Sequence, residues 1–423
     1  MSPPQESPVA AGAPAAPTRH PAAQRFVRVG GELTLGGERA SVLAARAGRT
    51  PFYAYDRALL TERVASLRAA LPASILLHYA IKANPMPALV QHMARLVDGL
   101  DVASGGELRV AMDSGIDPRE ISFAGPGKTD AELQQAVASG ILVNVESTRE
   151  LPVLAAASQA LGRPARVALR VNPDFELKSS GMKMGGGPKQ FGLDAGLVPQ
   201  ALREIAALGL AFEGFHLYAG SQNLRAESIC EAQTKALDLA FRLAGDAPSP
   251  VRVLNLGGGF GIPYFPGETP LDLGQVGRHL HAVADQARQQ LASARLVIEL
   301  GRYLVGEAGV YFARVIDRKV SRGEVFLVTD GGLHHHLAAS GNFGQVIRKN
   351  YPVEVATRPL EGPRERASVV GPLCTPLDLL ADRMDLAVCQ PGDLVAVFQS
   401  GAYGPSASPA TFLGHPPALE MLV

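Results

Sequence analysis

The sequence is poor in several features that mark other classes of protein. Its 423 residues include only three cysteines, Cys230, Cys374 and Cys389, too few and too scattered for a disulfide framework or a zinc site. Lys plus Arg and Asp plus Glu both number 40, so no net charge attracts nucleic acid or an anionic membrane. No apolar run approaches the roughly 20 residues of a membrane span. We therefore expect a cytoplasmic protein without nucleic-acid or membrane partners.

The chain begins with a segment of low complexity. Residues 1–24 are rich in Pro, Ala, Ser and Gln and lack the apolar stretch of a signal peptide, which predicts a disordered tail. Residues 25–50 contain alternating stretches at 26–29 and 32–35, separated by glycine pairs, which predicts a hairpin. We expect this N-terminal β segment to pack on the C-terminal domain.

Strands and helices alternate through residues 51–305. Helical spacing of Leu and Ala is evident at 57–70, 130–139 and 226–244. Eight strand and helix units predict a parallel (β/α)8 barrel of the α/β class. Residues 306–423 show β-branched alternation and predict an antiparallel β-domain, completed by the N-terminal hairpin. The expected barrel strands span residues 75–81, 100–103, 121–124, 141–145, 166–171, 212–217, 251–256 and 295–299.

Lys82 directly follows the first expected barrel strand. Asn84 and Pro85 end that strand and begin a loop. The carboxyl ends of barrel strands are where barrel enzymes place catalytic groups. An isolated lysine at such a place could equally be a surface residue with its amine in water.

Polar residues after later strands favour the catalytic interpretation. His216 ends the sixth strand, although a lone histidine in an apolar strand is more often a packed core residue. Three glycines, 257–259, follow the seventh and could either wrap a phosphate or form a tight connection. Glu299 ends the eighth, where a buried carboxylate needs a partner. With Lys82 as a covalent attachment point, this set predicts pyridoxal 5′-phosphate as cofactor.

The combined motifs resemble the fold-type III, alanine-racemase-like pyridoxal-phosphate decarboxylases of diaminopimelate, ornithine and arginine. The resemblance runs from about residue 50 to the C-terminus. Its motifs are residues 79–84, 101–108, 216–222, 257–261, 299–302, 371–374 and 401–404.

This resemblance implies roles for particular residues. Lys82 would carry the cofactor, His216 would stack on its ring, and Cys374 would protonate Cα from the partner subunit of a homodimer. Without the family, Cys374 could be a packing residue, although flanking Gly and Pro residues favour a rigid loop. A glutamate at 299, where related racemases have arginine, favours decarboxylation. The implied cofactor contacts are Lys82, His216, Ser221, Gly257, Gly258, Gly259, Glu299, Gly301, Arg302 and Tyr403, and the implied substrate contacts are Arg302, Thr375, Asp378 and Tyr403.

The chain departs from the family pattern where the distal end of the substrate binds. Thr375 occupies the position at which diaminopimelate and ornithine decarboxylases have an acid. Histidines 334–336 follow the Asp-Gly-Gly motif, where diaminopimelate enzymes continue towards an arginine and a tyrosine. Residues 401–416 resemble the branch associated with exosortase loci and with decarboxylation on acyl carrier proteins. We therefore expect a substrate with a modified distal end, such as a thioester on a carrier protein.

Other interpretations remain open. A meso-diaminopimelate decarboxylase that makes L-lysine is the first alternative, and a non-catalytic pyridoxal-phosphate-binding regulatory homologue is a less favoured one. Residues 334–336 could suggest a metal, but adjacent strand residues alternate faces and cannot all bind one ion. We expect no metal site.

Overall fold

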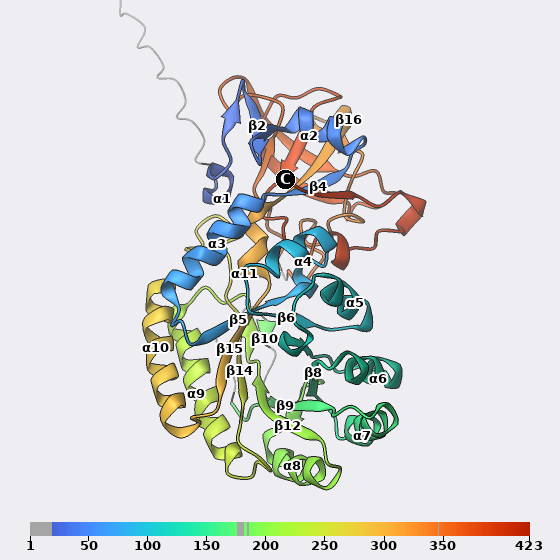
Figure 1. The fold of residues 1–423 in the computed structure, drawn as a ribbon. Coiled ribbons are helices and arrows are strands. Elements are labelled where there is room, and N and C mark those ends of the chain that lie inside the picture. The colour runs from blue at the N-terminus through green and yellow to red at the C-terminus, as the bar shows by residue number, and fades with distance from the viewer. Residues whose placement is uncertain (1–18, 176–181, 184–185, 346) are drawn as a thin grey trace, which may run out of the picture.

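The computed structural model describes residues 19–175, 182–183, 186–345 and 347–423. The chain forms a barrel domain and a β-domain that lie end to end (Figure 1). In the described part of the chain, no helix is both long and apolar enough to cross a membrane.

The barrel confirms the predicted α/β fold. All eight expected strands are present, they run parallel, and the pairing of β8 with β9 closes the ring. Because the strands are parallel, their carboxyl ends meet at one end of the barrel, beside the β-domain. The strands are β5 (Ile75–Ala80), β6 (Gly99–Val102), β7 (Ile121–Phe123), β8 (Leu142–Val145), β9 (Arg166–Asn172), β12 (Ala211–Leu217), β14 (Val253–Gly258) and β15 (Arg295–Leu300).

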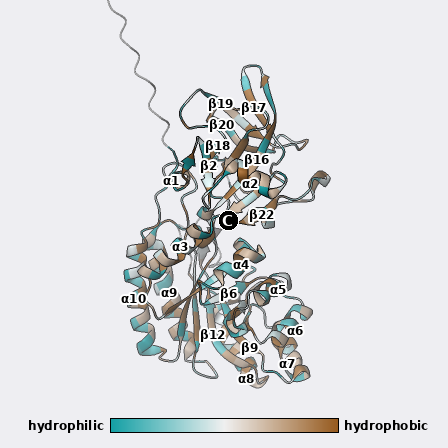
Figure 2. Cartoon of the chain, turned by 45° about the horizontal axis from the view of Figure 1, so that its top comes forward, coloured by the Kyte–Doolittle hydropathy of each residue, from teal (hydrophilic) through white to brown (hydrophobic). Residues whose placement is uncertain are grey.

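Helices cover the outside of the barrel. The expected helices at 57–70, 130–139 and 226–244 are confirmed with those bounds. Asp56 caps the first of them by accepting hydrogen bonds from two backbone N–H groups. Apolar strands lie inside a more polar layer of helices (Figure 2). The helices are α3 (Arg57–Ala70), α4 (Pro87–Met93), α5 (Gly105–Asp113), α6 (Asp130–Ser139), α7 (Glu150–Leu161), α8 (Val198–Ala207), α9 (Ala226–Ala244), α10 (Leu273–Gln290) and α11 (Arg302–Val305).

The β-domain contains a mixed sheet and not a wholly antiparallel one. Most neighbours are antiparallel, but β17 pairs with β19, and β22 with β4, in parallel. The long connection between β17 and β19 lets the chain re-enter in the same direction. The strands are β4 (Phe52–Tyr55), β16 (Gly309–Ser321), β17 (Glu324–Thr329), β18 (Val353–Val355), β19 (Arg364–Val370), β20 (Leu379–Ala387), β21 (Leu394–Val397) and β22 (Leu419–Leu422).

The N-terminal region packs on this domain in a way that differs from the expectation. The hairpin of β1 (Arg28–Val29) and β2 (Glu32–Leu35) forms a separate small sheet with β3 (Glu38–Arg39), followed by α2 (Ala40–Ala47). Leu33 and Leu35 pack in the apolar cluster of the β-domain. The strand that completes the main sheet is β4, between β16 and β22.

Two expected boundaries change as a result. Residues 52–55 belong to the β-domain sheet and not to the barrel, because all four side chains are buried there. Residues 21–24 of the expected tail form the short helix α1 (Pro21–Gln24), where Ala22 and Ala23 are buried. Residues 1–18 lie outside the described part of the chain.

Candidate active site

Lys82 lies where the barrel meets the β-domain. Strand β5 ends at Ala80, and residues 81–83 form a 3-10 turn that presents the lysine. Two hydrogen bonds tie this turn to the β-domain: Tyr403 N donates to Ala83 O at 2.7 Å, and Asn84 Nδ2 donates to Gly401 O at 3.0 Å. The Asn84 motif and the Gly-Ala-Tyr motif, more than 300 residues apart in the sequence, are therefore in direct contact.

The Lys82 side chain lines a small cavity at the carboxyl end of the barrel. Its accessible surface faces the space of this cavity, and protein surrounds the rest of the side chain. Its amine lies 5.7 Å from the centre of the Tyr218 ring. Burial alone would lower the pKa of this amine, but Tyr218, Tyr403 and Glu299 outweigh burial and raise the pKa. The amine is therefore a cation in the cofactor-free protein at neutral pH.

The glycine run after β14 makes one wall of the cavity. A Cβ atom at Gly258 would overlap the Glu299 carbonyl, and one at Gly259, where φ is +74°, would overlap the Gly220 carbonyl. Asn255 shapes the run by accepting a hydrogen bond from Gly257 N at 2.8 Å. Only glycine fits this close approach of backbones, so the loop leaves bare N–H groups for an anion.

His216 and Glu299 meet in the barrel interior. Both are buried, and His216 Nε2 lies 3.1 Å from Glu299 Oε2. With the residues that the structure describes, neither ring nitrogen of His216 makes an aligned hydrogen bond, whereas Asn255 Nδ2 donates to Glu299 Oε2 at 3.0 Å. Burial would raise the pKa of Glu299, but the charges of His216, Lys82 and Arg170 lower it. Glu299 is therefore ionised.

Arg302 is held by aromatic side chains beside the same cavity. Its guanidinium donates to Tyr264 Oη at 2.8 Å, and its Cζ lies 4.7 Å from the centre of the Tyr403 ring. Within the described part of the chain, Arg302 Nε has no hydrogen-bond partner. Tyr403 has a φ of 53°, in the left-handed region that a tyrosine seldom adopts. Such backbone strain is common where a side chain is held for function.

The structure thus brings most of the expected cofactor contacts together. His216 lies deeper, next to Glu299, and Gly257 and Gly258 continue the glycine run. The sequence interpretation gave no role to Tyr218, Phe260 and Arg170; the first two line the cavity, and Arg170 contacts Tyr218. The charge of Arg170 near the end of an otherwise apolar barrel strand is the sequence feature that could have indicated its role. Lining the cavity are Ala80, Lys82, Tyr218, Ser221, Gly259, Phe260, Glu299, Leu300, Gly301, Arg302 and Tyr403.

Cys374, Thr375 and Asp378 lie outside this cavity, in the loop between β19 and β20. Cys374 is exposed at the tip of the loop. Asp378 is buried, and its carboxylate accepts backbone N–H groups from Leu333 at 2.6 Å and Leu373 at 2.9 Å. The expected contact of Asp378 with substrate does not fit this arrangement, because both carboxylate oxygens bind the protein's own backbone.

The three consecutive histidines lie in turns and not in the expected strand. All three are buried. His335 Nε2 lies 2.9 Å from Pro416 O, and His336 Nε2 lies 2.9 Å from Ser400 Oγ. Burial lowers the pKa of His334 and of His336 to about 3, so both are neutral at physiological pH. His335 and His336 anchor the C-terminal segment of the β-domain.

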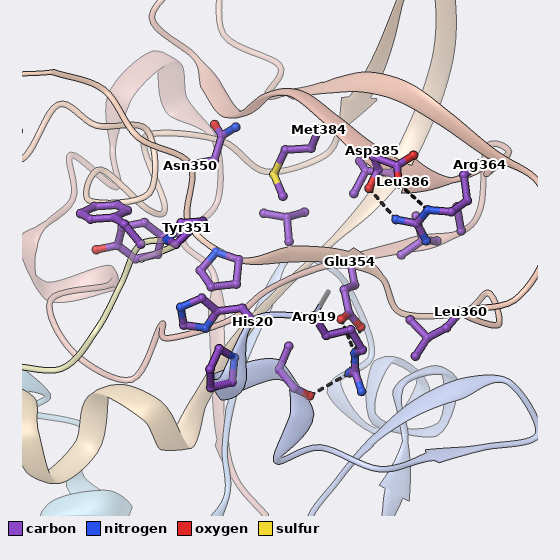
Figure 3. A pocket seen from close by; sticks show the side chains of 18 of the residues that line it. Arg19, His20, Asn350, Tyr351, Glu354, Leu360, Arg364, Met384, Asp385 and Leu386 are labelled. Carbon is purple, nitrogen blue, oxygen red and sulfur yellow. Dashed lines mark hydrogen bonds and ion pairs between the residues drawn. The ribbon is translucent and has the colours of Figure 1, made fainter. Parts of the chain in front are cut away.

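A larger cavity lies apart from these residues. It has a volume of about 710 Å³, against about 20 Å³ at Lys82, and lies between α1 and the β-domain (Figure 3). Its charged side chains are largely paired, as Arg19 is with Glu354 and Arg364 with Asp385. None of the expected catalytic, cofactor or substrate residues lines it.

The barrel and its site define the class of the protein. Residues 57–306 match the family model of the pyridoxal-dependent decarboxylases, pyridoxal binding domain. The chain belongs to this family. It is a pyridoxal-phosphate-dependent carboxy-lyase with the alanine-racemase-like fold.

Individual relatives sharpen this assignment. An L-glutamyl-[BtrI acyl-carrier protein] decarboxylase from Niallia circulans is 40% identical over 379 residues, 88% of each chain. A diaminopimelate decarboxylase from Aquifex aeolicus is 34% identical, covering 93% of this chain and 91% of its own. The crystal structure of diaminopimelate decarboxylase from M. jannaschii with L-lysine has a TM-score of 0.86 at 25% identity, covering 95% and 93%.

The site fits the family's cofactor. A lysine amine, a glycine cradle that any Cβ would fill and a buried ionised carboxylate face one cavity. Among the described residues, His216 Nδ1 and Arg302 Nε are buried and have no hydrogen-bond partner, as expected for groups that bind a ligand. These are the groups that a phosphorylated pyridine aldehyde requires.

Proposed function

We propose that the protein decarboxylates, at Cα, an amino acid that is tethered to an acyl carrier protein as a thioester. When bound, pyridoxal phosphate supplies the electron sink that stabilises negative charge at Cα as CO2 leaves. Lys82 binds the cofactor, His216 packs against its ring, and Glu299 keeps the ring nitrogen protonated. The ionised state of Glu299 and the buried His216 Nδ1, which has no hydrogen-bond partner among the described residues, support these roles.

The phosphate is held at the end of the cavity beside the β-domain. Ser221, the run Gly257–Gly259, Gly301 and Tyr403 surround this end, and Arg302 binds either the phosphate or the substrate carboxylate. Close backbone approach at the glycines supports a phosphate cradle, and the cation of Arg302 supports an anion beside it. With the ring held at one end and the phosphate at the other, the bound cofactor would orient the carboxylate on the substrate's Cα for loss as CO2.

Cys374 donates the proton to Cα from the other subunit of a homodimer. The thiol is exposed and lies outside the Lys82 cavity of its own chain, which supports a role in a partner's site. Large apolar side chains are exposed on nearby loops, and burying them in a subunit interface would stabilise a dimer. They are Phe343 (38% exposed), Ile347 (77%), Leu377 (59%) and Leu413 (54%).

The charges of the Cys374 loop are the observation on which the proposed thioester substrate rests. Thr375 follows the cysteine and bears no charge, and the carboxylate of Asp378 is occupied by two backbone N–H groups. The loop therefore offers no free carboxylate to a distal ammonium group. A thioester is neutral and needs none. The 40% identity to a decarboxylase named for a glutamyl carrier-protein substrate supports this choice.

The test is CO2 release by the purified holoenzyme. We expect release from an L-glutamyl thioester on a phosphopantetheinylated carrier protein, with kcat/KM at least about 100-fold above that for free meso-diaminopimelate, ornithine or arginine. Release from free meso-diaminopimelate at ordinary enzyme rates would instead make the protein a lysine-forming decarboxylase. Cofactor binding without turnover of any of these substrates would indicate a regulatory homologue.

A matched variant tests the pocket itself. Thr375→Glu places an acid directly after Cys374, so it should weaken turnover of the neutral thioester and raise turnover of a free diamino acid. Thr375→Ser, which adds no charge, is the control. Equal behaviour of both variants would contradict a distal site near Thr375.

The state of the cysteines bears on the cellular compartment of the enzyme. The three cysteines are free in the structure, which supports a reducing, cytoplasmic location.

A further inference from the structure

A buried carboxylate at the base of the Cys374 loop has no part in the reaction described so far. Asp378 is 3% exposed, although aspartates are seldom fully buried unless they have partners. Its oxygens accept hydrogen bonds from Leu333 N and Leu373 N, at 2.6 and 2.9 Å. Bonds from backbone N–H groups to an ionised acceptor are among the stronger hydrogen bonds in proteins.

The same residue closes the loop through its backbone. Gly371 N donates to Asp378 O at 3.0 Å, and Asp378 N donates to Thr375 O at 3.2 Å. With the side-chain bond to Leu373 N, three hydrogen bonds join Asp378 to residues on both sides of Cys374. The thiol therefore projects from a loop whose ends are fixed to one residue.

Two glycines mark how closely the chain packs around this carboxylate. A Cβ atom at Gly332 or at Gly371 would overlap the Asp378 carboxylate. Gly332 immediately precedes Leu333, and Gly371 lies two residues before Leu373, the two residues whose N–H groups the carboxylate binds. The carboxylate thus fills a space that two segments enclose from opposite sides.

The bond to Leu333 connects the Cys374 loop to the wall of the cofactor cavity. Leu333 begins the segment that contains the histidines, and Leu337 N of that segment donates to Ser408 Oγ at 3.0 Å. Ser408 follows Tyr403, which lines the Lys82 cavity, and Ser408 Oγ donates to Gly404 O at 2.7 Å. The covalent segment 333–337 and the hydrogen bonds at its two ends therefore link Asp378 with Gly404, the residue next to Tyr403.

We propose that Asp378 is a positioning residue that holds the Cys374 loop in the conformation that presents the thiol for proton delivery. The inference rests on the proposed function in one respect, that Cys374 is the proton donor. An acid must reach hydrogen-bonding distance of the atom it protonates, and a displacement of about 1 Å can cost on the order of 100-fold in rate. Asp378 acts on the reaction through this geometry and not by touching the substrate.

The test uses Asp378→Asn in the full-length holoenzyme. The amide can accept one of the two N–H groups but presents its own NH2 to the other. Asp385→Asn, on the strand β20 that directly follows Asp378 and paired with Arg364 at the surface, is the matched control. Amide hydrogen exchange at Leu333 and Leu373 should accelerate at least about tenfold in Asp378→Asn and stay unchanged in the control.

The alkylation rate of the Cys374 thiol gives a second readout that needs no turnover. It is measured in a background where Cys230 and Cys389 are replaced by alanine. The rate should change several-fold in Asp378→Asn and not in Asp385→Asn. If Asp378→Asn does not fold, Asp378→Ser, a smaller side chain that keeps one acceptor, is measured in the same way.

Turnover then separates positioning from general stability. Asp378→Asn should lower kcat by about 10- to 100-fold with KM nearly unchanged. Some product should be aldehyde, because a proton that goes to the cofactor instead of Cα leaves the amino group on the cofactor and water supplies the aldehyde oxygen. In a Cys374→Ala background, Asp378→Asn should have little further effect, since the two residues act as one unit.

Three results would overturn the proposal. They are unchanged exchange at both amides, an unchanged thiol rate, or a full additional loss of kcat in the Cys374→Ala background. If the enzyme proves to use free diaminopimelate, the proposed substrate fails, while the exchange, thiol and double-variant results still decide the role of Asp378.

Discussion

The two halves of the catalytic apparatus differ in how each is built. The Lys82 cavity is enclosed by one chain, and its charged groups are paired inside the barrel, as Glu299 is with His216. The Cys374 loop lies on the β-domain, and its thiol is exposed. The buried carboxylate of Asp378 in this loop accepts hydrogen bonds from the protein's own backbone. Under the proposed function, the cofactor binds to groups of one chain, whereas proton delivery from Cys374 would depend on how two chains meet.

Because the two halves are built differently, substitutions in one half need not affect the role of the other. The cofactor half must keep its charges and glycines, because they fit the pyridoxal phosphate of the family. Under the proposed function, the acid half would face the distal end of the substrate, where a threonine would suffice for a neutral group. Specificity can thus change in the Cys374 loop without disturbing cofactor binding.

The largest effect should come from breaking the cofactor half. Lys82→Ala removes the amine that binds the cofactor covalently, so CO2 release should fall by at least about 10⁴-fold. The absorbance of covalently bound cofactor should disappear as well. Lys128→Ala, at a buried lysine paired with Glu150, controls for loss of a buried cation; normal cofactor absorbance in Lys82→Ala would contradict the assignment.

Breaking the acid half should leave the cofactor in place. Cys374→Ala should lower amine formation by about 10²- to 10⁴-fold, the usual range for a general acid, while the absorbance of bound cofactor is retained. Cys230→Ala, on the surface helix α9, should be neutral. Loss of cofactor from Cys374→Ala would show that the two halves are not separable.

Glu299→Gln should reduce turnover by an intermediate amount. The glutamine cannot hold a proton on the ring nitrogen, so kcat should fall by about 10- to 100-fold. Cys374 is untouched, so the thiol alkylation rate should match that of the unmodified protein. A kcat within about twofold of the original would show that Glu299 does not act on the ring.

The same substitution has a pH signature in the cofactor-free protein. The folded state lowers the pKa of Glu299 below its usual value near 4.5, so this group stabilises the fold above that pH. The contribution is lost as the pH falls towards the folded pKa. The stability difference between the original protein and Glu299→Gln should therefore change between about pH 5 and pH 3 and be constant above pH 6, as measured by urea unfolding. A difference independent of pH would contradict the lowered pKa.

The smallest effect belongs to the anchoring histidines. His335→Ala removes the contact with Pro416 O and should lower the free energy of unfolding by about 1 kcal/mol, with KM for the thioester unchanged. A large change in KM would place His335 at the substrate after all.

The sequence predicted the barrel well because its strands and helices are strongly periodic. Lys82, the glycine run and Glu299 could be placed together since residues after parallel strands meet at one end. The role of β4 was missed because a buried Phe-Tyr-Ala-Tyr segment carries no sign of which sheet it joins. Asp378 was expected at the substrate because the sequence does not show that Leu333 and Leu373 supply its partners.

The separation of the two halves can be tested most directly by mixing two inactive variants. Lys82→Ala and Cys374→Ala homodimers are combined under conditions that exchange subunits, and CO2 release and amine formation are measured. If each site takes Lys82 from one chain and Cys374 from the other, random exchange should restore about a quarter of the original activity. No recovery, with exchange of subunits verified, would show that both residues act within one chain and would contradict the account.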